Sequence, residues 1–204
     1  MMTVDALMRA APVIPVLTVA DVRIAQPLAA ALVAGGLTTL EVTLRTPAAL
    51  QVITEMAKVD GAVVGAGTVL NPRDLDAAQR AGAVFAVSPG LTASLARAAL
   101  DRGFPLLPGI ATASDLMRGL DLGFERFKFF PAMANGGIPT LKALAAPFAR
   151  CRFCPTGGIT PDNADQWLAL DAVLCVGGSW LFSGDFDADV VLQRAKQATH
   201  GRRV

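Results

Sequence analysis

The stretch AVFAVSPGLTASLARAALDRGFPLL, from Ala83 to Leu107, contains one complete structural unit and the start of the next. Residues 83–90 form an apolar run of the length expected for a buried strand, and residues 94–102 have the composition of a helix. Gly103 follows the helical segment, where glycine is favoured because it adopts the left-handed conformation that ends helices. A second apolar run begins at Phe104. The stretch therefore predicts a strand, a loop, a helix and a glycine, followed by the next strand.

This unit recurs along the chain at a nearly constant interval. The glycines that close its helical segments are Gly36, Gly61, Gly82, Gly103 and Gly123, separated by 25, 21, 21 and 20 residues. At the other end of the unit, strand-like runs lead into Thr46-Pro47, Asn71-Pro72 and Thr160-Pro161. Each pair is a favoured N-cap residue followed by a proline suited to the first helical position. We therefore predict N-caps at Thr46, Asn71 and Thr160.

Eight apolar runs are expected to be strands, with helices between them and a last helix over residues 187–199. The runs cover residues 13–19, 38–44, 62–70, 83–90, 104–111, 126–132, 152–159 and 172–180. Strict alternation predicts a parallel sheet, and eight such units in 204 residues match the small end of the (β/α)₈ TIM barrel. No linker-like run divides the chain, so we expect an α/β fold, with residues 1–204 forming a single TIM-barrel domain. The alternative is an open doubly wound sheet, whose usual G-x-G-x-x-G after the first strand is absent from this sequence.

Composition and charge exclude several classes of protein. Hydrophobic residues make up 53% of the chain, which indicates strands buried on both faces or a surface buried between subunits. The apolar runs are broken well short of the roughly 20 residues of a spanning helix, so we expect no membrane insertion. A net charge of +1 without a basic cluster argues against nucleic-acid binding. Pro12 and Pro15 interrupt the apolar N-terminal segment and Asp5 weakens its positive start, which argues against a signal peptide.

The cysteines raise the question of a metal or redox site. Cys151 and Cys154 form a C-x-x-C pair, a spacing that can bind zinc or cycle as a disulfide, and Cys175 follows later. A zinc site needs about four ligands, and the only histidine, His200, lies in the polar tail. We therefore expect reduced, partly buried thiols in a cytosolic protein, with no metal and no cofactor.

Lys128 stands among Phe127, Phe129 and Phe130, where desolvating an ammonium group costs several kcal/mol. In a barrel, side chains along a strand alternate between the interior and the helix layer, and the active site lies at the C-terminal ends of the strands. Because Phe127 and Phe129 suit the helix layer, Lys128 is predicted to point into the barrel.

The same alternation places Glu41 and Thr43 of the run 38–44, and Arg45 directly after it, on the inner side of the barrel. The carboxyl group of Glu41 and the amine of Lys128 are therefore predicted to meet inside the barrel. A neutral lysine amine attacks a carbonyl to form a Schiff base, and a nearby carboxyl group can act as the general base. Lysine and carboxylate together suffice for carbon–carbon cleavage without a metal. The alternative is a buried ion pair with a purely structural role, although such pairs seldom repay their desolvation.

A second signal points to a phosphate group. PTGGI, residues 155–159, and VGGSW, residues 176–180, follow the last two expected strands. TIM barrels commonly bind phosphate there through backbone N–H groups, and glycine lets the backbone approach the anion. The alternative is that both are merely tight turns.

Seven motifs, in order and over nearly the whole chain, resemble those of one family. EVTLRT, VGAGTVLNP, SPG, PGIAT, FKFFPA, RFCPTGGI and VGGSWL are similar to the class I 2-keto-3-deoxy-6-phosphogluconate (KDPG) / 4-hydroxy-2-oxoglutarate (KHG) aldolases. The resemblance implies a lyase that cleaves a 2-keto-3-deoxy sugar acid phosphate to pyruvate and glyceraldehyde 3-phosphate in the Entner–Doudoroff pathway of carbohydrate metabolism. It also implies a cytoplasmic homotrimer.

The resemblance implies a role for each residue of its motifs. Lys128 would form the Schiff base and Glu41 would accept the proton, as the catalytic pair. The substrate-binding residues would be Arg45 and Thr68, which hold the pyruvyl carboxylate, Pro89 and Phe130, which wall the pocket, and Thr156, which lies beside the substrate. The phosphate-binding residues would be Gly157, Gly158, Gly178 and Ser179.

Two positions bear on the choice of substrate. The resemblance suggests that Thr156 favours the gluconate-derived substrate, because the related aldolases that act on the galactonate epimer tend to have an apolar residue at this position. Met133 departs from the glutamate that usually follows FKFFPA. Other functions on the same barrel stay open at this point: an aldolase for the galactonate epimer, a phosphosugar isomerase, a metal-dependent aldolase, or a silent phosphosugar-binding barrel.

Overall fold

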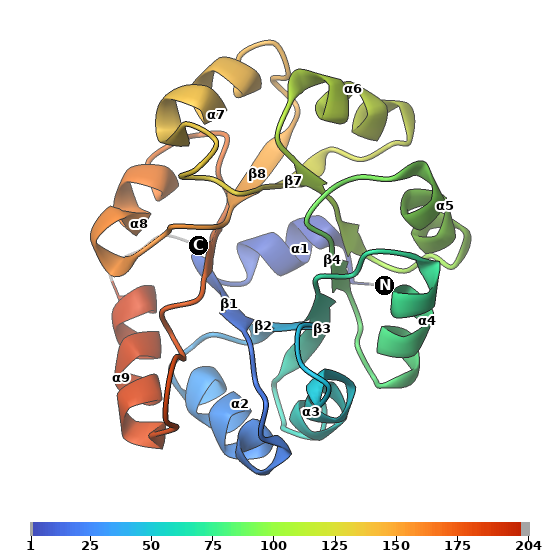
Figure 1. Ribbon diagram of the computed structural model, residues 1–204. Coiled ribbons are helices and arrows are strands. Elements are labelled where there is room, and N and C mark those ends of the chain that lie inside the picture. The colour runs from blue at the N-terminus through green and yellow to red at the C-terminus, as the bar shows by residue number, and fades with distance from the viewer. Residues whose placement is uncertain (1, 201–204) are drawn as a thin grey trace.

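Strands and helices alternate along the chain in the computed structural model, which describes residues 2–200 (Figure 1). Each strand lies within one of the eight predicted runs. The strands are β1 Val13–Leu17, β2 Thr39–Thr43, β3 Val63–Gly67, β4 Ala86–Val87, β5 Leu106–Leu107, β6 Gly109–Ile110, β7 Arg126–Phe129, β8 Arg152–Pro155 and β9 Val176–Gly178. The helices are α1 Val4–Arg9, the 3-10 turn η1 Val22–Ile24, α2 Ala25–Ala34, α3 Ala49–Met56, α4 Pro72–Arg80, α5 Ala93–Asp101, α6 Ala113–Asp121, α7 Gly137–Ala145, α8 Pro161–Leu168 and α9 Ala188–Thr199.

The strands form a curled parallel sheet in two sections, and helices surround it (Figure 1). One section has the order β5-β4-β3-β2-β1-β9 and the other has the order β6-β7-β8, with every pair parallel. β5 and β6 belong to one predicted run and are separated by Pro108, which has no N–H to donate to a ladder. Parallel bridges also join Phe153 to Val173 and Thr156 to Gly177, between β8 and the segment that contains β9.

The ends of the helices follow most of the sequence signals. All five periodic glycines have positive φ, from 59° at Gly103 to 99° at Gly82, which confirms their predicted role. Asn71 and Thr160 are N-caps as predicted. The prediction for Thr46 is wrong, because α3 begins two residues later than expected, with Ala48 at the N-cap. The Thr46 hydroxyl instead donates to the Val19 carbonyl at 2.7 Å, which ties this loop to the one after β1.

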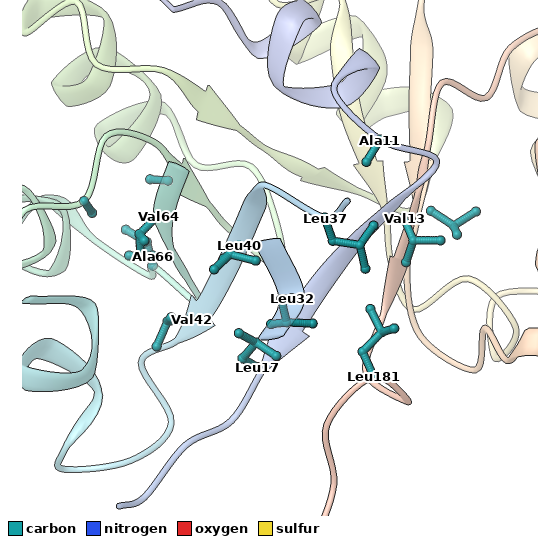
Figure 2. Close-up of a cluster of buried hydrophobic side chains, with 14 of the residues drawn as sticks. Ala11, Val13, Leu17, Leu32, Leu37, Leu40, Val42, Val64, Ala66 and Leu181 are labelled. Carbon is teal, nitrogen blue, oxygen red and sulfur yellow. The ribbon is translucent and has the colours of Figure 1, made fainter. Parts of the chain in front are cut away.

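Hydrophobic side chains on the outer side of the sheet pack against the helices. Figure 2 shows Leu40 and Val42 of β2 with Val64 and Ala66 of β3 in this layer, together with Leu32 of α2. All five are at most 2% exposed. Complete burial of a leucine or valine side chain stabilises the fold by about 1.5–3 kcal/mol, so this layer supplies much of the stability.

The inner side of the sheet holds a second, smaller core. It consists of Leu7 and Met8 from α1, of Ile14, Val87, Leu107 and Cys154 from the strands, and of Phe85 and Cys175, which directly precede β4 and β9. Asp5 of α1 accepts a 2.5 Å hydrogen bond from Arg126, the first residue of β7, so α1 covers the end of the sheet where the strands begin. Both faces of the sheet are therefore buried, as the hydrophobic composition indicates.

Within residues 2–200, every helix is too short or too polar to cross a bilayer.

Candidate active site

The Lys128 side chain crosses the inner side of the sheet and meets Glu41. Lys128 Nζ donates a hydrogen bond to Glu41 Oε1 at 3.1 Å, and the two residues are 6% and 3% exposed. The neighbours of the lysine on β7, Phe127 and Phe129, are fully buried on the opposite side, and the Phe129 ring lies 6.4 Å from that of Trp167 on α8. Alternation along β7 therefore directs the ammonium group inward, where burial requires a partner.

A cavity of about 340 Å³ opens above this pair, at the C-terminal ends of the strands. Ten of the eleven predicted site residues line it: Glu41, Arg45, Thr68, Pro89, Lys128, Phe130, Thr156, Gly157, Gly158 and Ser179. The ring of Phe130 lies beside the lysine, with Nζ 5.3 Å from its centroid. The structure thus gathers residues from six of the predicted strand–loop segments around one space.

Gly178 is the predicted residue that the cavity lining does not include; Gly177 takes its place. A Cβ atom at Gly178 would meet the Trp180 ring at 2.4 Å, on the side away from the cavity. The alternation that was applied to Lys128 and Glu41 places Gly177 and Ser179 on the inner side and excludes Gly178.

Four lining residues were not predicted as part of the site: Val16, Thr43, Ile159 and Gly177. Thr43 could have been predicted as a lining residue, because it lies two residues after Glu41 on the same side of β2. Its hydroxyl donates to the Leu17 carbonyl at 3.1 Å and lies 3.0 Å from the Thr18 hydroxyl, so it fastens the upper end of β2 to β1.

Arg45 reaches the cavity from a turn. β2 ends at Thr43, and the chain turns at residues 44–45, so Arg45 is not carried away from Glu41 along an extended strand. Its side chain is exposed at the cavity mouth, while Glu41 lies at the buried end of the same space. A guanidinium group at the mouth is suited to a carboxylate of a bound molecule.

Thr68 has an unusual backbone conformation, with φ of 58°. A β-branched residue rarely adopts positive φ, and such strained residues often occur at functional sites. The residues that follow hold it in place, because Val69 N donates to Val87 O at 3.1 Å and Leu70 N donates to Asp74 Oδ2 at 2.9 Å. The conformation places Thr68 on the cavity wall beyond β3.

The loop after β8 presents free backbone donors. Gly157 and Gly158 have φ of 99° and 76°, conformations that favour glycine. The Thr156 and Gly157 carbonyls accept from Ala132 N and Met133 N, at 2.8 and 3.1 Å, which fixes the loop against the segment after β7. Among residues 2–200, no acceptor is within hydrogen-bonding distance of the Gly157 and Gly158 N–H groups. Such donors are suited to an anion.

Met133, the departure from the family pattern, borders this loop. Its side chain is 48% exposed, and a Cβ atom at Gly158 would lie 2.7 Å from Met133 Cβ and Cγ. The thioether therefore covers the outer side of the Gly157–Gly158 turn rather than lining the cavity.

The three cysteines are free and buried, on both sides of the sheet. Cys151 belongs to the outer core, whereas Cys154 and Cys175 belong to the inner one, so the C-x-x-C pair is divided between two environments. Burial raises the pKa of the Cys151 thiol, and burial with the neighbouring Cys154 raises that of Cys175 well above its usual value. Among the described residues, no group of three or more His, Cys, Asp or Glu side chains could hold a metal ion.

A buried lysine beside a carboxylate, with a cation at the cavity mouth and a glycine turn suited to an anion, is an arrangement suited to Schiff-base chemistry on an anionic carbonyl compound. Residues 4–196 match the model of the KDPG and KHG aldolase family. The chain belongs to this family of carbon–carbon lyases.

Individual relatives agree with this assignment. The chain is 55% identical over 204 residues to the 2-dehydro-3-deoxy-phosphogluconate aldolase of Zymomonas mobilis, covering 100% of this chain and 98% of that protein. The crystal structure of the Z. mobilis ZM4 enzyme with 3-phosphoglycerate superposes with a TM-score of 0.96, at 56% identity, over 98% of this chain and 96% of that one. The KDPG aldolase of Legionella pneumophila, captured with pyruvate as a covalent carbinolamine intermediate, superposes with a TM-score of 0.92 at 43% identity, over 96% and 97% of the two chains.

Proposed function

We propose that this aldolase cleaves 2-dehydro-3-deoxy-6-phosphogluconate to pyruvate and D-glyceraldehyde 3-phosphate through a Schiff base on Lys128. The observation that carries the proposal is the 3.1 Å contact between Lys128 Nζ and Glu41 Oε1 inside a cavity that both side chains line. The names of the relatives support the substrate, and the carbinolamine of the Legionella enzyme supports the covalent route.

The reaction needs one amine and one carboxyl group. Lys128 first releases its ammonium proton to solvent, and the neutral amine then attacks the C2 carbonyl carbon; the carbinolamine takes up a proton from solvent and loses water to give a protonated imine. The Glu41 carboxylate takes the proton of the C4 hydroxyl while the C3–C4 bond breaks, and that electron pair passes to the imine nitrogen. The aldehyde leaves, and an enamine of pyruvate remains on the lysine. Glu41 returns its proton to the enamine carbon, and water then releases pyruvate and regenerates the amine.

The remaining cavity residues orient the substrate. Arg45 and Thr68 hold the pyruvyl carboxylate, through a charge-assisted hydrogen bond from the guanidinium and a second hydrogen bond from the hydroxyl. Pro89 and Phe130 form apolar walls beside the imine, which exclude water from it. Thr156 offers a hydroxyl to the substrate chain and favours the gluconate-derived compound over its galactonate epimer, because an apolar residue there would leave the substrate hydroxyl unpaired.

The 6-phosphate binds at the glycine turns. Gly157 and Gly158 donate backbone N–H groups, and Ser179 adds its hydroxyl from the turn after β9. Gly178, the last residue of β9, would contribute through its backbone alone, since its Cα faces away from the cavity. The proposed phosphate site consists of backbone N–H groups and a hydroxyl, and no cationic side chain takes part in it. The guanidinium group of Arg45 binds the carboxylate at the other end of the substrate.

The same centre also acts on 4-hydroxy-2-oxoglutarate, giving pyruvate and glyoxylate. The bond that breaks lies in the same position relative to the ketone, and the family model includes KHG aldolases. This substrate has no phosphate group and makes no use of the glycine turns, so the phosphorylated compound is the better substrate.

The proposal extends to the fold and the assembly. The sheet closes as an eight-stranded (β/α)₈ barrel that comprises residues 1–204 as one domain; the bridges Phe153–Val173 and Thr156–Gly177 support this closure. The family resemblance supports a homotrimer in the cytoplasm. Sedimentation equilibrium of the purified protein should give three times the mass of the chain, and a monomer mass would refute the trimer.

Trapping with pyruvate tests the chemistry. Incubation with pyruvate and borohydride should add a reduced three-carbon adduct at Lys128, located by peptide mass spectrometry. Glu41→Gln should keep most of this adduct and lose about 10²-fold or more in cleavage rate, because it removes the proton acceptor and leaves the amine. An unmodified Lys128 in a preparation that turns over substrate would refute the Schiff base. Undiminished cleavage by the Glu41→Gln variant would assign proton transfer to another group.

A further inference from the structure

Gly67, the last residue of β3, faces the Glu41 carboxyl group. A Cβ atom at this position would lie 2.2 Å from Glu41 Oε1, 2.6 Å from Cγ and 2.8 Å from Cδ, closer than real Cβ contacts allow. Gly67 pairs with Thr43 in the β2–β3 ladder and is not one of the described glycines with positive φ. Its backbone is thus ordinary strand, and the three atoms that most closely obstruct a side chain there all belong to Glu41.

We propose that Gly67 is a positioning residue for the lyase reaction: its missing side chain sets where the Glu41 carboxylate stands relative to Lys128. The inference deepens the proposed function and rests on it, because it assigns Gly67 a role through the proton transfer of Glu41. Gly67 touches neither the amine nor the substrate in this account.

The expected displacement follows from the contact distances. Ordinary contacts of a Cβ atom begin at 3.4 Å, so a methyl group at position 67 requires Oε1 to move by at least 1.2 Å, the difference between 3.4 and 2.2 Å. Glu41 is 3% exposed and Lys128 stands 3.1 Å away, so the carboxylate has no open side except the cavity. A general base works at about 2.6–3.2 Å from its proton, and a displacement of about 1 Å can cost 10²-fold in rate.

A second glycine on the same strand provides a matched control. Gly65 lies two residues earlier on the same side of β3, but a Cβ atom there would meet the Phe85 ring at 2.4 Å. Alanine at either position therefore adds one methyl group to the interior of the sheet. Gly65 is the ladder partner of Glu41, yet the atoms nearest to its Cβ belong to Phe85, whereas those nearest to a Cβ at Gly67 belong to the Glu41 side chain.

The first experiment compares the single variants. Gly67→Ala is expected to lower kcat for 2-dehydro-3-deoxy-6-phosphogluconate by about 10²-fold while KM changes less than fivefold. The borohydride-trapped pyruvate adduct at Lys128 should persist, since imine formation does not need the displaced carboxylate. A variant that lost both kcat and the adduct would show general damage to the site and would overturn the proposal.

The decisive experiment removes the obstructing atoms and measures stability. Glu41→Ala deletes Cγ, Cδ and Oε1, which lie 2.6, 2.8 and 2.2 Å from a Cβ atom at position 67, so it empties the space that the new methyl group needs. Gly67→Ala should therefore lower the urea midpoint of the parent protein and leave that of Glu41→Ala almost unchanged. Gly65→Ala should lower the midpoint equally in both backgrounds, because the atoms nearest to a Cβ there belong to Phe85.

Each other outcome is decisive. Retention of kcat within threefold in Gly67→Ala, or an equal fall in urea midpoint with and without Glu41→Ala, would overturn the positioning role. If Gly67→Ala does not fold, a folded double variant with Glu41→Ala supports the steric overlap, whereas an unfolded double variant beside a folded Glu41→Ala overturns it. A Glu41→Gln enzyme that cleaves at the parent rate would assign proton transfer to another group and refute the role of Glu41 in the proposed function, while an inactive Glu41→Gln beside a fully active Gly67→Ala would refute the present inference alone.

Discussion

Removing one partner of the Lys128–Glu41 pair should destabilise the protein far more than removing both. The two side chains are 7% and 4% exposed and are joined by the 3.1 Å contact. Lys128→Met leaves a buried carboxylate without its cation, and the loss of one partner from a buried pair typically lowers the free energy of unfolding by about 3–5 kcal/mol.

Glu41→Gln is milder because the amide keeps the volume and one acceptor oxygen. The lysine then loses a charged hydrogen-bond partner, which costs about 1.5–3 kcal/mol. The double variant has no charge at either position, and buried pairs replaced by neutral groups of similar size are often neutral or stabilising. Its free energy of unfolding should lie within about 1 kcal/mol of the parent, which gives a coupling of at least about 3 kcal/mol between the two substitutions.

Urea denaturation at pH 7 and one fixed protein concentration measures all four proteins, since the proposed trimer would make stability depend on concentration. The exposed pair Glu55–Lys58, at 2.6 Å with side chains 28% and 56% exposed, is the matched control and should show almost no coupling in the same cycle. If the double variant at Glu41 and Lys128 loses the full sum of the single losses, the two groups do not depend on each other for burial. The reasoning about their contact would then be wrong.

Two further predictions concern the two ends of the curled sheet. Ser179→Glu places a carboxylate at the proposed phosphate site, so steady-state kinetics should show KM for the phosphorylated substrate rising at least tenfold, with a much smaller change for 4-hydroxy-2-oxoglutarate; equal changes would move the phosphate site elsewhere. The hydrogen bond from Arg9, assisted by Arg126, lowers the pKa of Asp5 below its usual value of about 3.9. A lowered carboxyl pKa contributes stability that is complete above the unfolded value and is lost as pH falls through the folded one, so the stability difference between parent and Asp5→Asn should be constant from pH 7 to 5 and shrink as pH falls below about 4 in thermal denaturation. A difference that does not shrink below pH 4 would show that Asp5 acts through something other than its charge.

The elements of the fold were predictable where the signal is local. The spacing of the glycines predicted the helix ends, because the residue that ends a helix often adopts positive φ, which glycine does without steric cost. Thr46 shows the limit of this reasoning. Its sequence fits an N-cap, but its hydroxyl bonds to Val19 of the neighbouring loop, a contact between segments that are 27 residues apart. Propensity describes what a residue can do alone, and tertiary contacts decide between its options.

The candidate site was predictable where the sequence places a charged side chain in an apolar strand. Strand alternation placed Lys128 and Glu41 on the same side of the sheet, and a buried charge needs a partner. Gly67 gave no comparable signal. A glycine in a strand is uninformative until the group that fills its place is known, and that group comes from another strand. Residues that take part in the reaction can therefore be predicted from the sequence, whereas the glycines whose missing side chains leave space for them cannot.

This asymmetry has a physical origin in the packing of the sheet's inner side. The layer beneath the cavity is filled by apolar side chains such as Phe85, Val87 and Leu107. The layer above it must hold Glu41 and Thr156, and each is accommodated by a glycine on a neighbouring strand: Glu41 by Gly67, and Thr156 by Gly177, where a Cβ atom would lie 2.2 Å from the threonine hydroxyl oxygen. Interiors are close-packed, so each polar side chain needs a compensating loss of volume beside it. A side chain introduced at Gly67 or Gly177 should then displace Glu41 or Thr156, respectively, before it distorts the backbone.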